Sequence, residues 1–282
     1  MTLSILEVLD RSAAYFEKAG IANARLNAEW LLAEVLGCKR LDLYLRFDKP
    51  LGETDLEKLR PLVKRRQQRE PLQHILGSAP FHEIKLRCDA RALIPRPETE
   101  QLVELVRELF PAPPARVLDL GTGSGAIALS LAKMWPQSEV TAVDASADAL
   151  SLAAENAALN GLDKRVKLLS SDWFSNVQGS YELIVSNPPY LTREEWECAE
   201  PEVRNFDPYA ALVAEDDGLA DLSRILREAP AHLSAGGVLL METGIAQHPA
   251  LDRLAAQQGY ASFRGMKDLS GRPRFFVANK GD

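Results

Sequence analysis

Five short apolar segments alternate with helical segments between residues 116 and 241, and this alternation limits the possible folds more than any other feature. The apolar segments cover residues 117–120, 140–143, 166–169, 183–185 and 238–241, and helical patterns cover 126–133, 147–159 and 219–233. Strands that are apolar along their whole length, with helices between them, are typical of a parallel sheet covered on both faces. Two further β-like segments, 261–266 and 274–278, predict an antiparallel hairpin at one edge. We therefore predict an α/β fold.

The first 76 residues instead show the spacing of amphipathic helices. Leu3, Leu6 and Leu9 begin a series that repeats on one helical face. Thr54 is a candidate N-cap for a later helix over residues 55–69. After Gly77 the pattern changes to an imperfect alternation of apolar and polar residues, which is typical of a β-hairpin. We predict a helical domain at 1–76, a β-hairpin linker at 77–95 and an α/β domain at 96–282.

Four cations gather at the end of the predicted helix over residues 55–69. They are Lys64, Arg65, Arg66 and Arg69. Cations are stabilised near a helix C-terminus, so the simpler interpretation is a solvated helix end. The alternative is a docking patch for an acidic or ribonucleoprotein-associated partner, and the general weakness of charge runs as signals favours the first interpretation.

Composition narrows the class of protein. The chain has 282 residues, of which 46% are hydrophobic and 26% charged, as in ordinary globular proteins. The formal charge of −7 argues against direct nucleic-acid binding, because such proteins are usually basic. The three cysteines are far apart and the four histidines lack ligand spacing, so we expect no disulfide framework and no metal. Without a signal-peptide pattern or 18 consecutive apolar residues, we expect a cytoplasmic location and no membrane contact.

A glycine-rich turn follows the first strand of the alternating region, where open α/β sheets bind ligands. The turn consists of Gly121, Thr122, Gly123, Ser124 and Gly125. Its G-x-G-x-G spacing lacks the third glycine of the strict dinucleotide fingerprint, but the alanine at 126 fits the tolerated variant. The turn alone therefore leaves a nicotinamide cofactor open.

The next two strands end in residues suited to adenosine. Asp144 follows the second strand, where a carboxylate can accept hydrogen bonds from both ribose hydroxyls. Asp172 and Trp173 follow the third strand, where an acid can bind the adenine amino group and an indole can cover the ring. Alternatively, the glycines make only a tight turn and Asp144 caps a helix. Three consecutive strand ends with suitable chemistry favour adenosine recognition.

The fourth strand ends in the tetrapeptide Asn187-Pro188-Pro189-Tyr190. Two prolines can simply end a strand, but they also restrict the backbone of Asn187 and Pro188. The Asn187 side-chain carbonyl and the Pro188 carbonyl can accept both hydrogens of a planar –NH2 group, with Tyr190 against its plane. Such a nitrogen is a poor nucleophile, and two acceptors orient it and favour the positive charge that develops during attack. A sulfonium methyl is an electrophile that needs no metal, so we predict methyl transfer to such a nitrogen.

These motifs resemble those of S-adenosylmethionine-dependent methyltransferases of the N-P-P-Y type. The whole chain is more specifically similar to the HemK-type glutamine methyltransferases that modify peptide chain release factors. The segment Ile94–Glu100, I-P-R-P-E-T-E, is the more specific match, because N-P-P-Y also occurs in adenine- and guanine-modifying enzymes. Other matching segments are Glu200–Val203, Glu215–Leu219 and Lys267–Arg272. His82-Glu83 stands where members often have an aromatic-glycine pair.

The resemblance implies a Rossmann-like seven-stranded methyltransferase sheet behind a small helical domain that recognises the partner. It implies transfer of a methyl group from S-adenosylmethionine to the N5 amide of the glutamine in the Gly-Gly-Gln loop of release factors, which leaves S-adenosylhomocysteine. It implies cofactor contacts at Gly121–Gly125, Asp144, Trp173 and Asn187. The glutamine amide would be held by Asn187, Pro188, Pro189 and Tyr190, and Arg96 and Thr99 would lie near the cofactor pocket.

Two alternative functions use the same motifs. A nucleic-acid methyltransferase acting on adenine N6 or guanine N2 would place a flipped base in the pocket, but the net charge argues against it. A cofactor-binding module without catalysis is disfavoured by the intact N-P-P-Y segment, since binding alone does not need acceptors for an –NH2 group.

Overall fold

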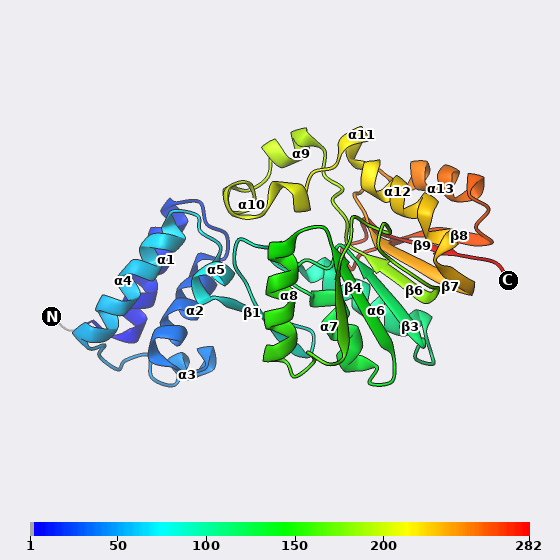
Figure 1. The fold of residues 1–282 in the computed structure, drawn as a ribbon. Helices are drawn as coiled ribbons and strands as arrows, with labels where there is room; N and C mark the ends of the chain where they lie inside the picture. Colours follow the sequence, from blue (N-terminus) through cyan, green and yellow to red (C-terminus); the bar gives the residue numbers. More distant parts are fainter. Residues whose placement is uncertain (1–2) are drawn as a thin grey trace. The chain divides into compact units, whose positions relative to one another are not determined.

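The α/β region contains a sheet of seven strands. In the computed structural model, which describes residues 3–282, the strands lie in the order β5-β4-β3-β6-β7-β9-β8 (Figure 1). Their bounds are β3 (Arg116–Leu120), β4 (Glu139–Asp144), β5 (Val166–Ser170), β6 (Tyr181–Ser186), β7 (Leu233–Glu242), β8 (Ser262–Lys267) and β9 (Pro273–Asn279).

Strands β3 to β7 pair in parallel, whereas β9 pairs antiparallel with both β7 and β8. This confirms the predicted mostly parallel sheet with an antiparallel hairpin at its edge. Strand β3 lies between β4 and β6. The chain places β4 and β5 on one side of β3 and then places β6 and β7 on its other side, so the strand order reverses at β3. Ligands of open α/β sheets bind at such a reversal, outside the carboxyl ends of the strands.

Helices cover both faces of this sheet. One face packs against α6 (Pro97–Leu109), α7 (Ala126–Met134) and α8 (Ala147–Leu159), and the other against α12 (Ala220–Glu228) and α13 (His248–Gln257) (Figure 1). Successive residues of a strand point to opposite faces, so Val117 joins the first core while Leu118 and Leu120 join the second. Burial on both sides explains why the strands are apolar at consecutive positions.

The segment between β6 and β7 contains several short helices. They are α9 (Arg193–Glu197), α10 (Pro201–Phe206), the 3-10 turn η1 (Tyr209–Ala211), α11 (Glu215–Gly218), then α12 and the 3-10 turn η2 (Ala229–Ala231). The expected helix over 219–233 therefore ends too late, because Pro230 falls in the 3-10 turn and an interior proline breaks an α-helix. Its residues 220–228 are helical as expected.

The N-terminal unit is helical, as expected. Its helices are α1 (Ile5–Lys18), α2 (Ala24–Leu36), α3 (Arg40–Tyr44), α4 (Glu53–Gln67) and α5 (Leu72–Leu76). Phe16, Leu31 and Leu32 are completely buried in its core. The Ser4 side chain caps α1, but the expected cap at Thr54 is wrong. Helix α4 begins at Glu53 after Gly52, which places Thr54 inside the first turn.

The boundaries between compact units differ in detail from the sequence-based division. One unit comprises residues up to Gly77 together with Pro201–Phe206, and the other comprises Ser78–Glu200 and Asp207–Asp282. The hairpin of β1 (Ser78–Phe81) and β2 (Ile84–Arg87) belongs to the larger unit, because its apolar side chains join the core beneath α6 and α7. His82 makes the hairpin turn with a positive φ of 50°.

The three arginines among the cations at the end of α4 form ion pairs with carboxylates of the chain. Arg65 pairs with Glu70, and both Arg66 and Arg69 bind Glu202 of α10, within the N-terminal unit. Arg66 is only 6% exposed. Arg66 and Arg69 do not form an open docking patch, because Glu202 pairs with both. Lys64 is exposed and Arg65 half-exposed in the last turn of α4, as the simpler interpretation expects. None of the helices in the described part of the chain combines the length and apolar character needed to cross a bilayer.

Candidate functional site

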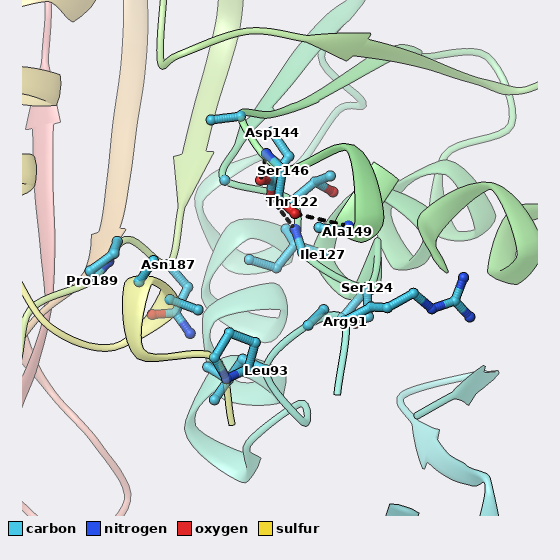
Figure 2. Close-up of a pocket in the computed structure, with 18 of the residues that line it drawn as sticks. Arg91, Leu93, Thr122, Ser124, Ile127, Asp144, Ser146, Ala149, Asn187 and Pro189 are labelled. Carbon is cyan, nitrogen blue, oxygen red and sulfur yellow. Dashed lines mark hydrogen bonds between the residues drawn. The ribbon is translucent and has the colours of Figure 1, made fainter. Parts of the chain in front are cut away.

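A cavity of about 330 Å³ opens at the carboxyl ends of β3, β4, β5 and β6, within the larger unit (Figure 2). The sheet brings together predicted residues that are up to 68 positions apart in the sequence, from Gly121 to Pro189. Predicted site residues that line it are Gly121, Thr122, Gly123, Ser124, Asp144, Asp172, Trp173, Asn187 and Pro189. Figure 2 shows Asn187 and Pro189 together on one side, away from Asp144 and Ser146.

The glycine turn leaves space beside an indole ring. Gly121 has a φ of +68°, and a Cβ atom on it would lie 3.2 Å from the Trp173 ring. Glycine adopts this left-handed conformation readily and avoids the contact. Gly125 does not line the cavity among the described residues. It precedes α7, and its Cβ would lie 3.0 Å from Leu129. Its absence of a side chain therefore serves packing beneath the turn.

Asp144 is tied to both neighbouring segments of the cavity wall. Its Oδ2 accepts a hydrogen bond of 2.8 Å from the Gly123 backbone N–H, and its Oδ1 accepts one of 2.9 Å from the Ser146 N–H. A carboxylate has about four acceptor positions, so these two contacts leave room for ligand hydroxyls. The alternative of a simple helix cap does not fit, because the Ser146 hydroxyl, not Asp144, is the N-cap acceptor of α8.

Trp173 is held by a residue that the sequence did not single out. Its Nε1 donates a 3.0 Å hydrogen bond to Asp221 at the start of α12. Burial raises the pKa of the Asp221 carboxyl above its ordinary value, although the indole bond and Arg224 oppose the shift. Asp172 lines the cavity, but its carboxylate binds Arg224 at 2.9 and 3.0 Å. Its predicted contact with an adenine amino group would have to coexist with this ion pair.

Asp119, in the strand before the glycine turn, is fully buried. Its Oδ2 accepts bonds from the Thr122 hydroxyl at 2.6 Å and the Ala128 N–H at 3.2 Å. Among residues 3–282, no donor reaches its Oδ1. Burial raises the pKa of Asp119 to about 7, against the effect of those two hydrogen bonds. A buried carboxylate oxygen without a donor is stabilised by a cationic ligand group, directly or through water.

The N-P-P-Y segment presents two acceptors. Asn187 is partly exposed and lines the cavity, whereas Pro188 is buried and is not among the described lining residues. The Asn187 Nδ2 donates to the Thr99 hydroxyl at 3.1 Å. Within the described part of the chain, no hydrogen bond is accepted by Asn187 Oδ1 or by the Pro188 carbonyl. Both predicted acceptors are therefore without a protein donor.

Tyr190 lies behind the cavity wall and is anchored at both ends. Its hydroxyl donates a 2.9 Å hydrogen bond to Glu242 at the end of β7. Burial raises the pKa of the phenol, and the neighbouring Glu242 charge raises it further, so Tyr190 stays protonated. Its backbone carbonyl accepts a 2.9 Å bond from Gln247. The predicted stacking of Tyr190 against a planar group stays a prediction.

Of the two residues placed near the pocket by resemblance, Thr99 lines the cavity. Arg96 is not among its described lining residues, and its guanidinium binds the buried Asp207 at 2.5 Å. An ion pair between Arg96 and Glu100 at the start of α6 would be the simplest role for this arginine, but the Glu100 carboxylate instead accepts a hydrogen bond from the His82 N–H. Residues 3–282 contain no group of three or more His, Cys, Asp or Glu side chains suited to a metal ion.

Known proteins resemble this chain along its whole length. Residues 7–77 match the family described as PrmC N-terminal domain, and residues 99–200 match that described as Methyltransferase small domain. A Deinococcus radiodurans protein named Release factor glutamine methyltransferase is 42% identical over 99% of both chains. A Geobacter sulfurreducens protein of the same name is 40% identical over 96% of this chain and 95% of its own. A crystal structure of a Pyrococcus furiosus methyltransferase, 19% identical, has a TM-score of 0.54 over 71% of this chain and 90% of that one.

Proposed function

Because the chain belongs to the release factor glutamine methyltransferase family, we propose that it transfers a methyl group from S-adenosylmethionine to a release factor. The acceptor atom is the N5 side-chain amide nitrogen of the glutamine in the Gly-Gly-Gln loop. The observation that carries this proposal is the pair of acceptors, Asn187 Oδ1 and the Pro188 carbonyl, that no donor among residues 3–282 reaches, beside a cavity at the strand ends.

The residues around the cavity fit the cofactor. Asp144 retains acceptor positions for the ribose hydroxyls, and Trp173 presents a ring for the adenine. Asp119 is not among the described lining residues, but it lies in the strand just before the glycine turn and has one oxygen that no described donor reaches. Gly121 and Gly123 let the backbone approach the ligand closely. When bound, S-adenosylmethionine supplies an electrophilic methyl group on a sulfonium, and S-adenosylhomocysteine is the product.

Asn187 and Pro188 would hold the glutamine amide by its two N–H bonds. An amide nitrogen is weakly nucleophilic because its lone pair is delocalised. Two fixed acceptors orient the nitrogen and stabilise the positive charge that grows on it during attack. The amide proton becomes acidic as the N–C bond forms and can then leave to water, so this mechanism needs no strong base. Pro189 lines the cavity beside this amide, and Tyr190 supports that wall from behind.

We assign partner recognition to the N-terminal helical unit, which supplies none of the residues that line the described cavity. The family of the first 77 residues is described separately from the methyltransferase domain, which supports a distinct role. We also propose that the protein acts in the cytoplasm and without a metal, since the acceptor pair can orient the nucleophile without one.

The test is incubation with S-adenosylmethionine carrying a labelled methyl group and a purified release factor, followed by peptide mapping. We expect one label on the glutamine of the Gly-Gly-Gln loop. Asn187→Ala should reduce transfer at least a hundredfold, because it removes a charge-stabilising acceptor. Asn160→Ala is the control, since Asn160 lies at the end of α8 and does not line the cavity.

A nucleic-acid amine methyltransferase is the second candidate, since the same pocket would accept a flipped base. The charge of −7 disfavours it. Label on DNA or RNA but not on the release factor would overturn the first proposal in favour of the second.

A further inference from the structure

A chain of buried hydrogen bonds runs from the cavity wall to the end of β7. Asn187 Nδ2 lies 3.1 Å from Thr99 Oγ1, and Thr99 Oγ1 lies 2.9 Å from Glu242 Oε2. The other oxygen of Glu242 accepts the Tyr190 hydroxyl at 2.9 Å. Thr99 is 4% and Glu242 1% exposed, so water does not compete for these bonds. Three elements, α6, β7 and the segment after β6, meet at this point.

The count of protons fixes the direction of every bond in this chain. An ionised carboxylate only accepts, so Thr99 must give its single hydroxyl proton to Glu242. The Thr99 oxygen then offers only lone pairs, and only a donor can approach it. Asn187 satisfies it by turning its NH2 group toward Thr99. The side-chain carbonyl of Asn187 is consequently turned away from Thr99 and is available to accept a hydrogen from the substrate.

We propose that Glu242 and Thr99 are positioning residues that determine which end of the Asn187 amide is presented to the substrate. This inference rests on the proposed function, because it assigns the supports of the same –NH2 site. Neither residue needs to touch the reacting atoms. An asparagine without such a support can rotate by 180° about its terminal bond, which would present NH2 in place of the carbonyl and repel the substrate amide.

Protonation of Glu242 would reverse the direction of the hydrogen bonds between Glu242, Thr99 and Asn187. A protonated carboxyl can donate to Thr99, whose own hydroxyl proton then points toward Asn187 and favours the flipped amide. The groups that face Glu242 are Glu98 of α6, Tyr190 after β6 and Arg274 of β9. Burial raises the pKa of Glu242 to about 6, and Glu98 adds to the rise, while Arg274 and the bonds from Thr99 and Tyr190 oppose it. The enzyme should therefore lose activity as the pH falls through about 6.

The first measurement follows the Asn187 side-chain NH2 by NMR, without cofactor or substrate. Its resonance is identified by its loss in Asn187→Ala. We expect Thr99→Val to move the hydrogen-bonded proton upfield and to speed its exchange with solvent, and Thr99→Ser to restore the wild-type signal. Thr243→Val is the matched control. Thr243 is also fully buried and follows Glu242 in the sequence, but its hydroxyl binds His248 and takes no part in the hydrogen bonds that link Asn187, Thr99 and Glu242.

The second measurement is kcat/KM for the release factor across pH 5 to 8. Loss of one net hydrogen bond predicts a fall of about tenfold for Thr99→Val, with recovery in Thr99→Ser. Glu242→Gln cannot titrate, so it should lower the rate and abolish the dependence near pH 6, in both the kinetic profile and the Asn187 signal. Asp119, whose pKa is raised to about 7, is unchanged in Glu242→Gln. A pH dependence that disappears in this variant is therefore due to Glu242 and not to Asp119.

The outcomes separate the two proposals. An Asn187 signal that is unchanged in Thr99→Val, or changed equally in Thr243→Val, would overturn the positioning role. A wild-type enzyme that leaves the release factor unmodified, while its Asn187 signal still depends on Thr99 and Glu242, would overturn the proposed function and leave the hydrogen-bond chain supported.

Discussion

A Cβ atom placed on Gly218 would lie 2.2 Å from the backbone carbonyl oxygen of Tyr190. Gly218 also has a φ of +78°. The Gln247 side chain bridges the two residues, because its Nε2 donates to the carbonyls of both Tyr190 and Gly218 at 2.9 Å. The α11 turn is thus pressed against the backbone that carries the N-P-P-Y segment, and only glycine allows this approach.

We predict that Gly218→Ala lowers kcat/KM for methyl transfer about a hundredfold, because the methyl group must displace Tyr190 and a shift of about 1 Å has such an effect on aligned reactants. Gly259→Ala is the control. Gly259 has a similar φ of +74°, but none of the described residues places a heavy atom within 4 Å of its Cβ position. Both variants should lose about 1 kcal/mol of stability from the strained φ. Equal activity in the two variants would contradict the role given to the close contact.

Trp173 should contribute to cofactor affinity through the face of its ring. We predict that Trp173→Leu weakens S-adenosylmethionine binding about fivefold, since stacking on an aromatic face adds about 1 kcal/mol. Asp221→Ala should weaken it less, because the ring remains but loses its 3.0 Å hydrogen bond. Titration calorimetry without the release factor measures both. Trp196→Leu, which alters an indole packed on Tyr209 outside the cavity, should bind as wild type.

Asp119 makes the unliganded protein less stable as the pH rises. Its folded pKa of about 7 lies above the ordinary 3.8, so between these values the folded state binds more protons than the unfolded state. The free energy of unfolding therefore falls from about pH 4 to about pH 7. We predict that Asp119→Asn removes this fall, which urea unfolding at several pH values measures.

The same substitution should weaken cofactor binding, since the buried carboxylate charge is lost. Asp148→Asn, at an exposed position of α8, is the control, and its stability should follow the wild-type pH curve. A pH curve for Asp119→Asn that parallels wild type would show that Asp119 is not the group that titrates.

Local sequence patterns predicted what depends on local chemistry. The ends of the strands could be predicted because each apolar run stops at a polar residue, such as Asp144 or Asn187. Parallel strands bring these ends to the same edge of the sheet, which predicts where the site lies. Glu242 was not predicted as a site residue, because its partner Thr99 lies 143 positions away and nothing near either residue encodes their contact. Asp221 was missed for the same reason.

The segment Pro201–Phe206 could not be assigned to the N-terminal unit from the sequence. Its Glu202 binds Arg66 at 2.7 Å and Arg69 at 2.6 Å, more than 130 positions away. The arginines alone read as a solvated helix end or a docking patch, because the carboxylate that satisfies them is distant in the chain. The sequence identifies Glu200–Val203 only as a segment that matches the family. The ion pairs with Arg66 and Arg69 give Glu202 of this segment a structural role.

Glu202 should stabilise the helical unit by satisfying a buried guanidinium. Arg66 is 6% exposed and also binds Asn27 at 2.8 Å. We predict that Glu202→Ala lowers the free energy of unfolding by about 3 kcal/mol, because it leaves a buried charge without its carboxylate. Glu202→Gln, which keeps a neutral acceptor, should lose less. Hydrogen exchange of the α2 and α4 amides during urea titration reports on this unit directly.

The pH dependence gives this prediction a second readout. Burial raises the pKa of Glu202, but the bonds from Arg66 and Arg69 outweigh it and hold the pKa below the ordinary 4.5. Its stabilisation is therefore present above pH 4.5 and is lost as the pH falls through the lower folded value. Glu202→Ala should lack this acid loss. Glu197→Ala, which removes a carboxylate paired with the exposed Arg193, should unfold as wild type, and an equal effect of both substitutions would contradict the special role of Glu202.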